Sequence, residues 1–414
     1  MRRRVVVTGL GAVTPLGNDV ATTWRALQDG VSGASGITKF DASTFPVRFA
    51  CEVKGFDPLK VMERKEAKRT DPYTQYAVAA SVEAMADAGL TGGTYDVDRL
   101  GVIIGSGIGG LKSFEEQHDI YRERGASKIS PFFIPMFIAD IAAGVVSMRF
   151  NARGPNYATV SACASSAHAI GDAFRTIQYG DADVMISGGA EAAVTAMSIG
   201  GFANMKALST RNDSPETASR PFDKDRDGFV MGEGAGIVIL ESLDHALARG
   251  ARIYGELAGY RATGDAYHLT GQLPDHEGLQ RAMRGALADG GLTPADVDYV
   301  NAHGTSTPLN DSNEAKAIAT VFGEAASRVS VSSTKSMTGH MLGAATGLEF
   351  LVATLAIRDQ IIPPTINHFT PDPECGDLDF TPNHAKKREV RAALSNSAGF
   401  GGHNVSIAVT RYQE

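Results

Sequence analysis

The sequence is poor in cysteine and tryptophan, with three cysteines and one tryptophan among 414 residues. Cys51, Cys163 and Cys375 lie far apart and cannot all pair, so they indicate neither a disulfide framework nor a metal-binding knuckle. Free cysteines are typical of a reducing compartment. We therefore expect the protein in the cytoplasm.

Long apolar runs and an excess of positive charge are also missing. No run of about 18 apolar residues is present to cross a bilayer. The basic start at residues 1–4 resembles a signal peptide, but glycines and a proline at residues 9–15 interrupt the apolar stretch, so a first strand is expected instead. The net charge of -8 argues against nucleic acid or an anionic membrane as partner.

What the chain does contain is ample apolar material (43%) and 46 glycines. Strand-like and helix-like runs alternate, which predicts an α/β protein with largely parallel, buried sheets. The expected strands are Arg4–Thr8, Gly101–Gly105, Val184–Gly188, Gly236–Glu241, Val297–Ala302, Val329–Ser333, Ala392–Ser397 and Val405–Thr410. The expected helices are Pro72–Ala88, Cys163–Tyr179, Glu277–Gly290, Asp311–Phe322 and Met341–Arg358.

The two halves of the chain share a layout. A strand, Cys163 and an apolar helix follow one another in the first half, and a strand, residues 334–340 and a second apolar helix do so in the second. This pattern suggests an internal duplication that divides near residue 250, into halves 1–250 and 251–414. Because no low-complexity linker separates them, we expect the halves to pack together.

Cys163 follows a short β-prone stretch, Tyr157–Ser161, and begins a run with small or apolar residues at helical spacing. A cysteine at a helix N-terminus is favoured as a thiolate, because the unpaired N–H groups and the helix dipole stabilise negative charge. It is therefore a candidate nucleophile. The alternative, a small buried apolar residue, stays open at this point.

Two histidines stand at the ends of later strands. His303 lies in Asn301-Ala302-His303-Gly304-Thr305-Ser306-Thr307, a run of small and hydroxyl residues suited to pack around a polar ligand. His340 opens the second apolar helix, where the helix N-terminus disfavours the protonated imidazole. Each is a candidate general base or hydrogen-bond donor. A hydrogen-bonded structural histidine is the alternative.

Glu349 is the only charged residue between Met341 and Ile357, in a helix that is apolar on nearly every side. A buried carboxylate is costly unless it is paired. Lys335, just before that helix, is the natural partner, and we predict an ion pair that orients the loop carrying His340.

Residues 395–404, Ser-Asn-Ser-Ala-Gly-Phe-Gly-Gly-His-Asn, follow a late strand. Glycines around Phe400 suggest a backbone that approaches a ligand closely, with an aromatic ring able to swing. A glycine-rich turn with a packing phenylalanine is the alternative reading.

Two familiar motifs do not fit. Residues 105–110 match G-x-G-x-x-G after a strand, but Leu111–Ser113 does not open a convincing helix and no ribose-binding acid follows at the right spacing. Asp223–Gly228 begins like a calcium loop, but its twelfth position is Gly234 instead of glutamate, and a salt-bridged turn is favoured. Neither NAD nor calcium is therefore expected.

Taken together, Cys163 in SACASSAHAI, His303 in NAHGTSTP, Lys335 and His340 in KSMTGHMLGAATG, and Phe400 in SNSAGFGGHN resemble the β-ketoacyl-acyl carrier protein synthases, most of all the synthase II group. The resemblance runs from residue 5 to the end of the chain. It implies a thiolase-like fold, with duplicated halves in a five-layered αβαβα sandwich, and a homodimer. Asn310 departs from the glycine common after the HGTSTP motif.

The resemblance implies a decarboxylating condensation that elongates acyl chains by two carbons and needs no cofactor. Cys163 would carry the acyl group, and backbone N–H groups of Cys163 and Phe400 would form the oxyanion hole. His303 and His340 would bind the malonyl thioester carbonyl. Lys335 and Glu349 would support them, and the Phe400 ring would act as a gate.

Further roles follow from the same resemblance. Thr305 and Thr307 would bind the phosphopantetheine arm of an acyl carrier protein. Other substrate contacts would come from Ile108, Phe202, Thr270, Gly399 and Gly401, and carrier docking from Lys65, Lys68, Arg69, Lys206 and Arg211. No catalytic metal is implied, although the family allows a monovalent cation near Asn301, Glu349 and Asn396.

Three rivals remain at the level of sequence. A stand-alone ketosynthase of a dissociated polyketide pathway would carry nearly the same motifs. A non-catalytic partner subunit would lack the nucleophile, which is present here. A degradative thiolase would use a second cysteine as base, and Cys375 lies in an acidic, proline-rich segment unsuited to that role.

Overall fold

The computed structural model describes residues 2–90 and 93–413. Its principal sheet has ten strands in the order β10-β9-β13-β14-β8-β1-β7-β6-β4-β5. These strands are β1 (Val5–Val13), β4 (Leu100–Gly105), β5 (Asn156–Tyr157), β6 (Val184–Glu191), β7 (Gly234–Ser242), β8 (Gly255–Gly264), β9 (Tyr299–Asn301), β10 (Ser330–Ser332), β13 (Ala392–Gly399) and β14 (His403–Thr410). The two-stranded pairs are β2 (Ser35–Gly36) with β3 (Phe49–Ala50), and β11 (Ile361–Ile362) with β12 (Lys386–Lys387).

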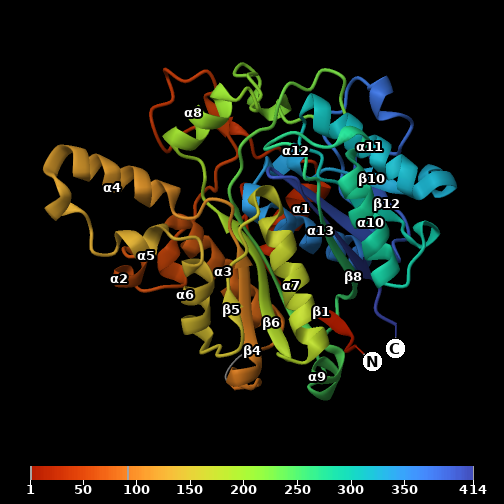
Figure 1. The fold of residues 1–414 in the computed structure, drawn as a ribbon, viewed down its shortest axis with the longest axis horizontal. Helices are drawn as coiled ribbons and strands as arrows, with labels where there is room; N and C mark the ends of the chain where they lie inside the picture. Colours follow the sequence, from red (N-terminus) through yellow and green to blue (C-terminus); the bar gives the residue numbers. More distant parts are fainter. Residues whose placement is uncertain (1, 91–92, 414) are drawn as a thin grey trace.

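The helices surround this sheet (Figure 1). They are α1 (Val20–Gln28), α2 (Arg64–Ala67), α3 (Pro72–Asp87), α4 (Leu111–Arg124), α5 (Phe133–Phe137), α6 (Ile141–Phe150), α7 (Ser165–Tyr179), α8 (Ala196–Asn204), α9 (Leu243–Ala248), α10 (Glu277–Asp289), α11 (Pro308–Phe322), α12 (Lys335–Thr338) and α13 (Ala345–Asp359). Among the described residues, no helix is long and apolar enough to cross a membrane.

Strand order and direction repeat between the two halves. The first half reads β5-β4-β6-β7-β1 and the second β10-β9-β13-β14-β8, so the strands occupy equivalent places in chain order. In both halves the pairs toward the outer edge are parallel and the pairs toward the centre are antiparallel. The halves meet through a short antiparallel contact in which Val6 faces Glu256. The topology is that of a duplicated α/β unit, as expected.

Helices form three layers around the two half-sheets. Helices α3 and α6 cover the outer face of the first half-sheet, and α10 with α11 cover that of the second. Between them, α7 and α13 contact each other and strands of both halves. This is the five-layered αβαβα arrangement expected of the thiolase-like fold.

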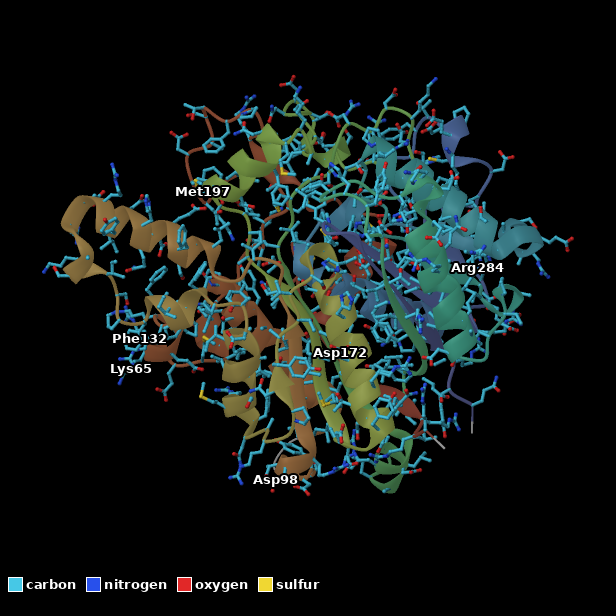
Figure 2. The ribbon with its side chains drawn as sticks, in the orientation of Figure 1. Lys65, Asp98, Phe132, Asp172, Met197 and Arg284 are labelled. Carbon is cyan, nitrogen blue, oxygen red and sulfur yellow. The ribbon has the colours of Figure 1, made fainter. Side chains whose placement is uncertain are left out.

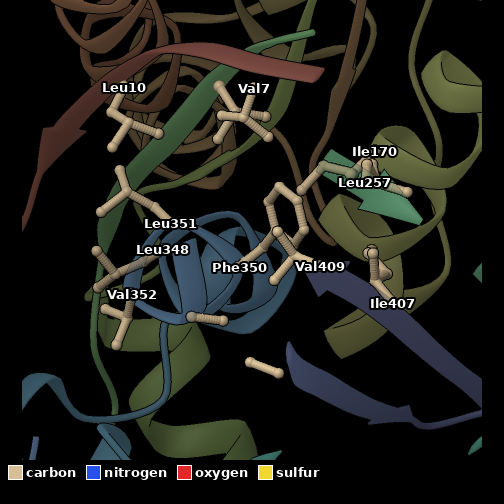
Figure 3. Close-up of a cluster of buried hydrophobic side chains, with 14 of the residues drawn as sticks. Val7, Leu10, Ile170, Leu257, Leu348, Phe350, Leu351, Val352, Ile407 and Val409 are labelled. Carbon is tan, nitrogen blue, oxygen red and sulfur yellow. The ribbon is translucent and has the colours of Figure 1, made fainter. Parts of the chain in front are cut away.

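The central layer is built from small and apolar residues. Every residue of α13 from Ala345 to Ile357 is buried, and its leucines and Phe350 pack against Val7, Ile170 and Val409 (Figure 3). Close approach requires glycine at Gly236, because a Cβ there would lie 2.2 Å from the backbone N of Leu348. Full burial of the helix explains why it shows no polar face in the sequence.

The structure corrects four expectations. The sheet is mixed, because β7, β1, β14 and β8 run antiparallel to their neighbours. Strand β8 was not predicted, since its three glycines and mixed burial hide the β pattern. Leu111 does open a helix, α4, which projects from the body of the molecule (Figure 1). The helices predicted from Cys163 and from Met341 begin later, at Ser165 and Ala345, each after a short 3₁₀ turn.

Candidate active site

One cavity of about 470 Å³ brings together Cys163 from the turn before α7, His303 from the loop after β9 and His340 from the segment between α12 and α13. Its wall also includes most of the residues expected to touch substrate. These are Phe202, Thr270, Thr305, Thr307 and Gly399, and the wall also includes Phe400 and the expected docking residue Lys206. Neither Ile108, Gly401 nor Cys375 lines it, and Ile108 instead packs in the apolar cluster that contains Cys163 and Phe202.

Cys163 lies at a sharp turn. The 3₁₀ turn Ala162–Ala164 precedes α7, and Ala162 adopts the left-handed region with φ 52°. The second half repeats this turn before α13, where Leu342 has φ 47° and Gly343 occupies the place of the cysteine. A non-glycine residue held in this region is typical of a functional turn.

The thiol itself is not acidic in this structure, so the expectation of a thiolate favoured by the helix N-terminus is wrong for the resting state. Burial raises the pKa of the Cys163 thiol to about 11. The positive charge of Lys335 and the backbone N–H groups of Phe400 and Cys163 lower this pKa, but burial outweighs them. Those two N–H groups are the ones expected to form an oxyanion hole, and both act on the sulfur.

His340 is neutral and its tautomer is fixed. The backbone N–H of Leu342 donates to His340 Nδ1 over 3.2 Å, so Nε2 carries the ring proton. Burial and the Lys335 charge hold the pKa of His340 well below its usual range. The neutral state was expected, but its cause is burial rather than a helix N-terminus, since α13 begins five residues later.

His303 follows β9, and its backbone is held by a residue that sequence reasoning missed. The N–H groups of His303 and Gly304 donate to the Glu314 carboxylate over 2.8 and 2.7 Å. The His303 and His340 rings lie edge to face with centroids 5.4 Å apart. Burial lowers the pKa of His303 far below its usual range, and Lys335, His340 and His276 lower it further.

The predicted ion pair between Lys335 and Glu349 is confirmed. Lys335 Nζ donates to Glu349 Oε1, and only 1% and 2% of the two residues are exposed. Burial raises the pKa of Glu349, and the Lys335 charge opposes that rise. Lys335 thus lies within electrostatic reach of Cys163 and both histidines.

Phe400 occupies the turn between β13 and β14, where positive φ values at Gly401 (92°) and Gly402 (76°) require glycine. Its ring centroid lies 6.4 Å from that of Phe202. The N–H of Gly401 donates to Leu269 O over 2.7 Å, which joins this turn to the segment carrying Thr270. Across the cavity, the hydroxyls of Thr305 and Thr307 are hydrogen-bonded over 2.8 Å.

The basic residues expected to dock the carrier protein do not lie together at one entrance to the cavity. Lys206 lines the cavity, and Arg211 is engaged by Asp225 O and the Asp227 carboxylate. Lys65 lies on α2, at the lower left of the view (Figure 2). Lys68 and Arg69 directly follow α2, and the Arg69 guanidinium stacks on the Phe132 ring 4.1 Å from its centroid.

Two of the three residues expected near a monovalent cation, Asn301 and Glu349, carry a buried oxygen without a hydrogen-bond partner. Asn301 Oδ1, Glu349 Oε2 and Ser395 Oγ are buried without a hydrogen-bond partner, and Asn301 and Ser395 face each other on paired strands. The side chain of Asn396 contacts Met283 of α10 instead and accepts a hydrogen bond from Ser406. Unlike Asn301 and Glu349, Asn396 therefore has no unpartnered oxygen. The described residues hold no cluster of three His, Cys, Asp or Glu ligands.

The two rejected motifs have structural roles. The N–H groups of Gly107 and Ile108 donate to the buried Glu191 carboxylate, so this glycine-rich loop does not offer them to a phosphate. In the segment 223–228, Arg226 pairs with Asp372 over 2.6 Å and donates to Pro308 O, which fixes the loop after His303. This is the salt-bridged turn that was expected.

Comparisons with known proteins agree with this geometry. The family model "Beta-ketoacyl synthase, N-terminal domain" matches residues 2–246, and "Beta-ketoacyl synthase, C-terminal domain" matches residues 254–369. The 3-oxoacyl-[acyl-carrier-protein] synthase 2 of Synechocystis sp. is 54% identical over 412 residues, covering 100% of this chain and 99% of the relative.

Two solved structures share the fold over their whole length. The ishigamide ketosynthase/chain length factor has a TM-score of 0.93 and 36% identity, with 100% of each chain covered. A type II PKS acyl-carrier protein in complex with its ketosynthase, bound to the hexaketide, has a TM-score of 0.92 and 37% identity, again with 100% of each chain covered. With both family models matched across most of its length, this chain belongs to the β-ketoacyl synthase family.

Proposed function

We propose that this chain is a type II 3-oxoacyl-[acyl-carrier-protein] synthase, which elongates fatty acyl chains by condensing them with malonyl-acyl carrier protein. The observation that carries the proposal is the single cavity in which Cys163 meets two neutral histidines beside a buried lysine. The full-length relative with 54% identity bears the same activity in its name.

In the first step Cys163 attacks the acyl thioester of the carrier. The C–S bond to the carrier breaks, a new one forms to Cys163, and the proton of the Cys163 thiol passes to the departing pantetheine thiol. The N–H groups of Cys163 and Phe400, which act on the sulfur at rest, are placed to bind the oxyanion of the tetrahedral intermediate. Because burial raises the pKa of this thiol, it becomes a strong nucleophile only as its proton leaves.

In the second step a malonyl thioester enters beside His303 and His340. Its C–C bond breaks, carbon dioxide leaves, and the electron pair forms an enolate whose carbon attacks the acyl–Cys163 thioester. Cys163 departs as a thiolate and takes up a proton. His340 offers Nε2–H to the enolate oxygen, because its Nδ1 already accepts from Leu342.

Neutral histidines suit this step. A protonated imidazole would deliver its proton to the carbanion and end the reaction before condensation. The low pKa values of His303 and His340, caused first by burial and then by Lys335, keep both rings neutral at physiological pH. We assign to Glu349 the task of holding Lys335 in place.

The approach to the cavity fits a carrier-bound substrate. We assign the phosphopantetheine arm to Thr305, Thr307 and Thr270, which line the cavity wall. We assign to the Phe400 ring, on a turn with two glycines at positive φ, the role of the gate that admits malonyl groups only after acylation. We assign carrier docking to Lys65, Lys68, Arg69, Lys206 and Arg211. Of these five residues, Lys206 lines the cavity.

We propose a homodimer formed through the β5 edge of the sheet. Strand β5 is the last strand of its half-sheet. The nearby side chains of Met148, Tyr157 and Val160 are exposed apolar groups, and Val160 lies three residues before the nucleophile. An unpaired edge flanked by apolar side chains is suited to a two-fold contact with a second copy. Light scattering should show a particle of twice the chain mass, and a monomer at micromolar concentration would contradict this.

Three further assignments complete the proposal. The chain divides near residue 250 into a half that carries Cys163 and a half that carries His303 and His340. Asn301, Glu349 and Ser395 would hold a monovalent cation, which would supply positive charge beneath the active site. The three free cysteines favour the cytoplasm as the place of reaction.

The polyketide alternative is not favoured, because the relative named 3-oxoacyl-[acyl-carrier-protein] synthase 2 is 54% identical to this chain, whereas the two ketosynthase structures are 36% and 37% identical. The decisive experiment mixes the protein with acyl- and malonyl-loaded carrier and follows the carrier by mass spectrometry. A single β-ketoacyl product, two carbons longer, is expected. Repeated extension without reduction would favour the polyketide alternative, and an unchanged acyl chain would contradict both.

A further inference from the structure

Two buried carboxylates hold equivalent loops in the two halves. Glu314 accepts from the backbone N–H groups of His303 and Gly304, in the loop after β9. Glu191 does the same for Gly107 and Ile108, over 2.7 and 3.2 Å, in the loop after β4. Both carboxylates are fully buried, a costly position that hydrogen-bond donors must offset.

Glu191 differs from Glu314 because it also reaches across to the other half. Its Oε2 accepts from the N–H of Gly343 over 3.0 Å, and its Oε1 from Ser106 Oγ over 3.0 Å. The loop after β4 and the turn Leu342–Ala344 are in direct contact where Gly107 meets Gly343. A Cβ on Gly343 would lie 2.2 Å from Gly107 N and 2.7 Å from Glu191 Oε2.

The two segments that Glu191 joins, the turn at Gly343 and the loop at Ile108, both lie next to residues of the reaction centre. Gly343 directly follows Leu342, whose N–H fixes the tautomer of His340. At the other end, Ile108 packs with Cys163 and Leu342 in one apolar cluster. Displacement of either end would therefore change the surroundings of His340 or of the nucleophile.

We infer that Glu191 is a positioning residue, which locks the turn carrying His340 against the loop carrying Ile108 and so keeps the His340 Nε2–H directed at the malonyl thioester. This inference rests on the proposed function for its catalytic consequence. It rests on the hydrogen bonds alone for its effect on the His340 tautomer.

Glu191→Gln tests the lock with little change in volume. A glutamine presents one acceptor and one NH₂ donor, so at least one backbone N–H among those of Gly107, Ile108 and Gly343 must face another donor. Glu83→Gln is the matched control. The Glu83 carboxylate accepts from the N–H groups of Ala12 and Val20, and burial raises its pKa to about 7, as for Glu191, but its hydrogen bonds reach neither the turn after His340 nor the loop carrying Ile108.

Two readouts separate positioning from stability. The first is decarboxylation of malonyl thioester, which we expect to fall at least tenfold in Glu191→Gln and to stay within twofold of wild type in Glu83→Gln, at comparable shifts in melting temperature. The second is the ¹⁵N spectrum of histidine-labelled protein, with His340 assigned through His340→Gln. The single Nε2–H tautomer of His340 in the wild type should become mixed in Glu191→Gln.

Equal decarboxylation in the two variants, with an unchanged His340 tautomer, would overturn the inference. If the wild type fails to decarboxylate malonyl thioester, the proposed function falls, and the tautomer readout still decides on Glu191. If Glu191→Gln does not fold, Ser106→Ala takes its place, because it removes one donor to the carboxylate. A two- to fivefold loss of decarboxylation in Ser106→Ala would support the lock, and an unchanged rate would overturn it.

Discussion

Variants of the buried ion pair between Lys335 and Glu349 distinguish most sharply between effects on the free energy of unfolding and effects on catalytic activity. Lys335→Met removes the charge but keeps most of the side-chain volume, and leaves the Glu349 carboxylate buried among apolar residues of α13. Breaking a buried pair in this way costs about 3–5 kcal/mol. Urea denaturation should show a loss of this size in the free energy of unfolding at pH 8.

The loss should shrink at low pH. Without Lys335, burial raises the pKa of Glu349 with less opposition, so the folded state holds the proton more tightly than the unfolded state. A raised pKa in the folded state favours folding below the unfolded value, and this contribution is lost as pH rises through the folded value. Lys335→Met should therefore be less destabilised at pH 5 than at pH 8.

The double variant Lys335→Met/Glu349→Leu completes the test. Replacing a whole buried pair with apolar residues is neutral or stabilising by about 1–4 kcal/mol, so stability should return. Activity should not return, because the Lys335 charge that lowers the pKa of Cys163, and that adds to burial in lowering the pKa of both histidines, is still absent. Alkylation of Cys163 by iodoacetamide should slow roughly tenfold or more in both variants. A double variant that is stable and fully active would refute this reasoning.

Three further outcomes follow from the same geometry. Iodoacetamide should label Cys163 at a rate that rises from pH 8 to pH 10, because burial raises the pKa of this thiol to about 11. It should spare Cys51 and Cys375, because burial raises the pKa of each of these thiols to about 12. Peptide mapping that finds equal labelling of the three cysteines would contradict this. His340→Gln should lower malonyl decarboxylation roughly 100-fold while acyl transfer to Cys163 persists, and loss of both steps together would argue against separate roles. Phe400→Ala should raise the ratio of carbon dioxide released to β-ketoacyl product formed, and an unchanged ratio would remove the ring from its role as a gate.

Much of the site could be predicted because its side chains stand at strand ends. His303 follows β9 directly, Cys163 follows β5 within six residues and His340 follows β10 after the short helix α12, and the structure brings the three into one cavity. The pair of Lys335 with Glu349 could also be predicted, since an isolated charge in an apolar helix needs a partner.

The supporting contacts could not be predicted, because they join side chains to backbone N–H groups. The residue types of Gly107, Gly304 and Leu342 do not predict which carboxylate or imidazole accepts a hydrogen bond from their backbone N–H groups. Glu191 and Glu314 were missed for this reason. A glutamate at the end of a buried glycine-containing strand, as at Glu191, is the one signal available in the sequence.

Two other differences between the predictions and the structure depend on the fold as a whole. The thiol pKa of Cys163 depends on desolvation by the whole cavity wall, which outweighs the local effect of a helix N-terminus. The direction of β7 and β14 depends on the fold of each half as a unit rather than on the strand patterns.

The most direct test of the central claim is to locate the acyl group during turnover. Protein incubated with acyl-loaded carrier alone, then quenched in acid and digested, should yield the peptide around Cys163 with the mass of one acyl group added. The adduct should disappear when malonyl carrier follows, and should be absent from Cys163→Ala. An acyl group found elsewhere, or condensation that proceeds in Cys163→Ala, would contradict the account.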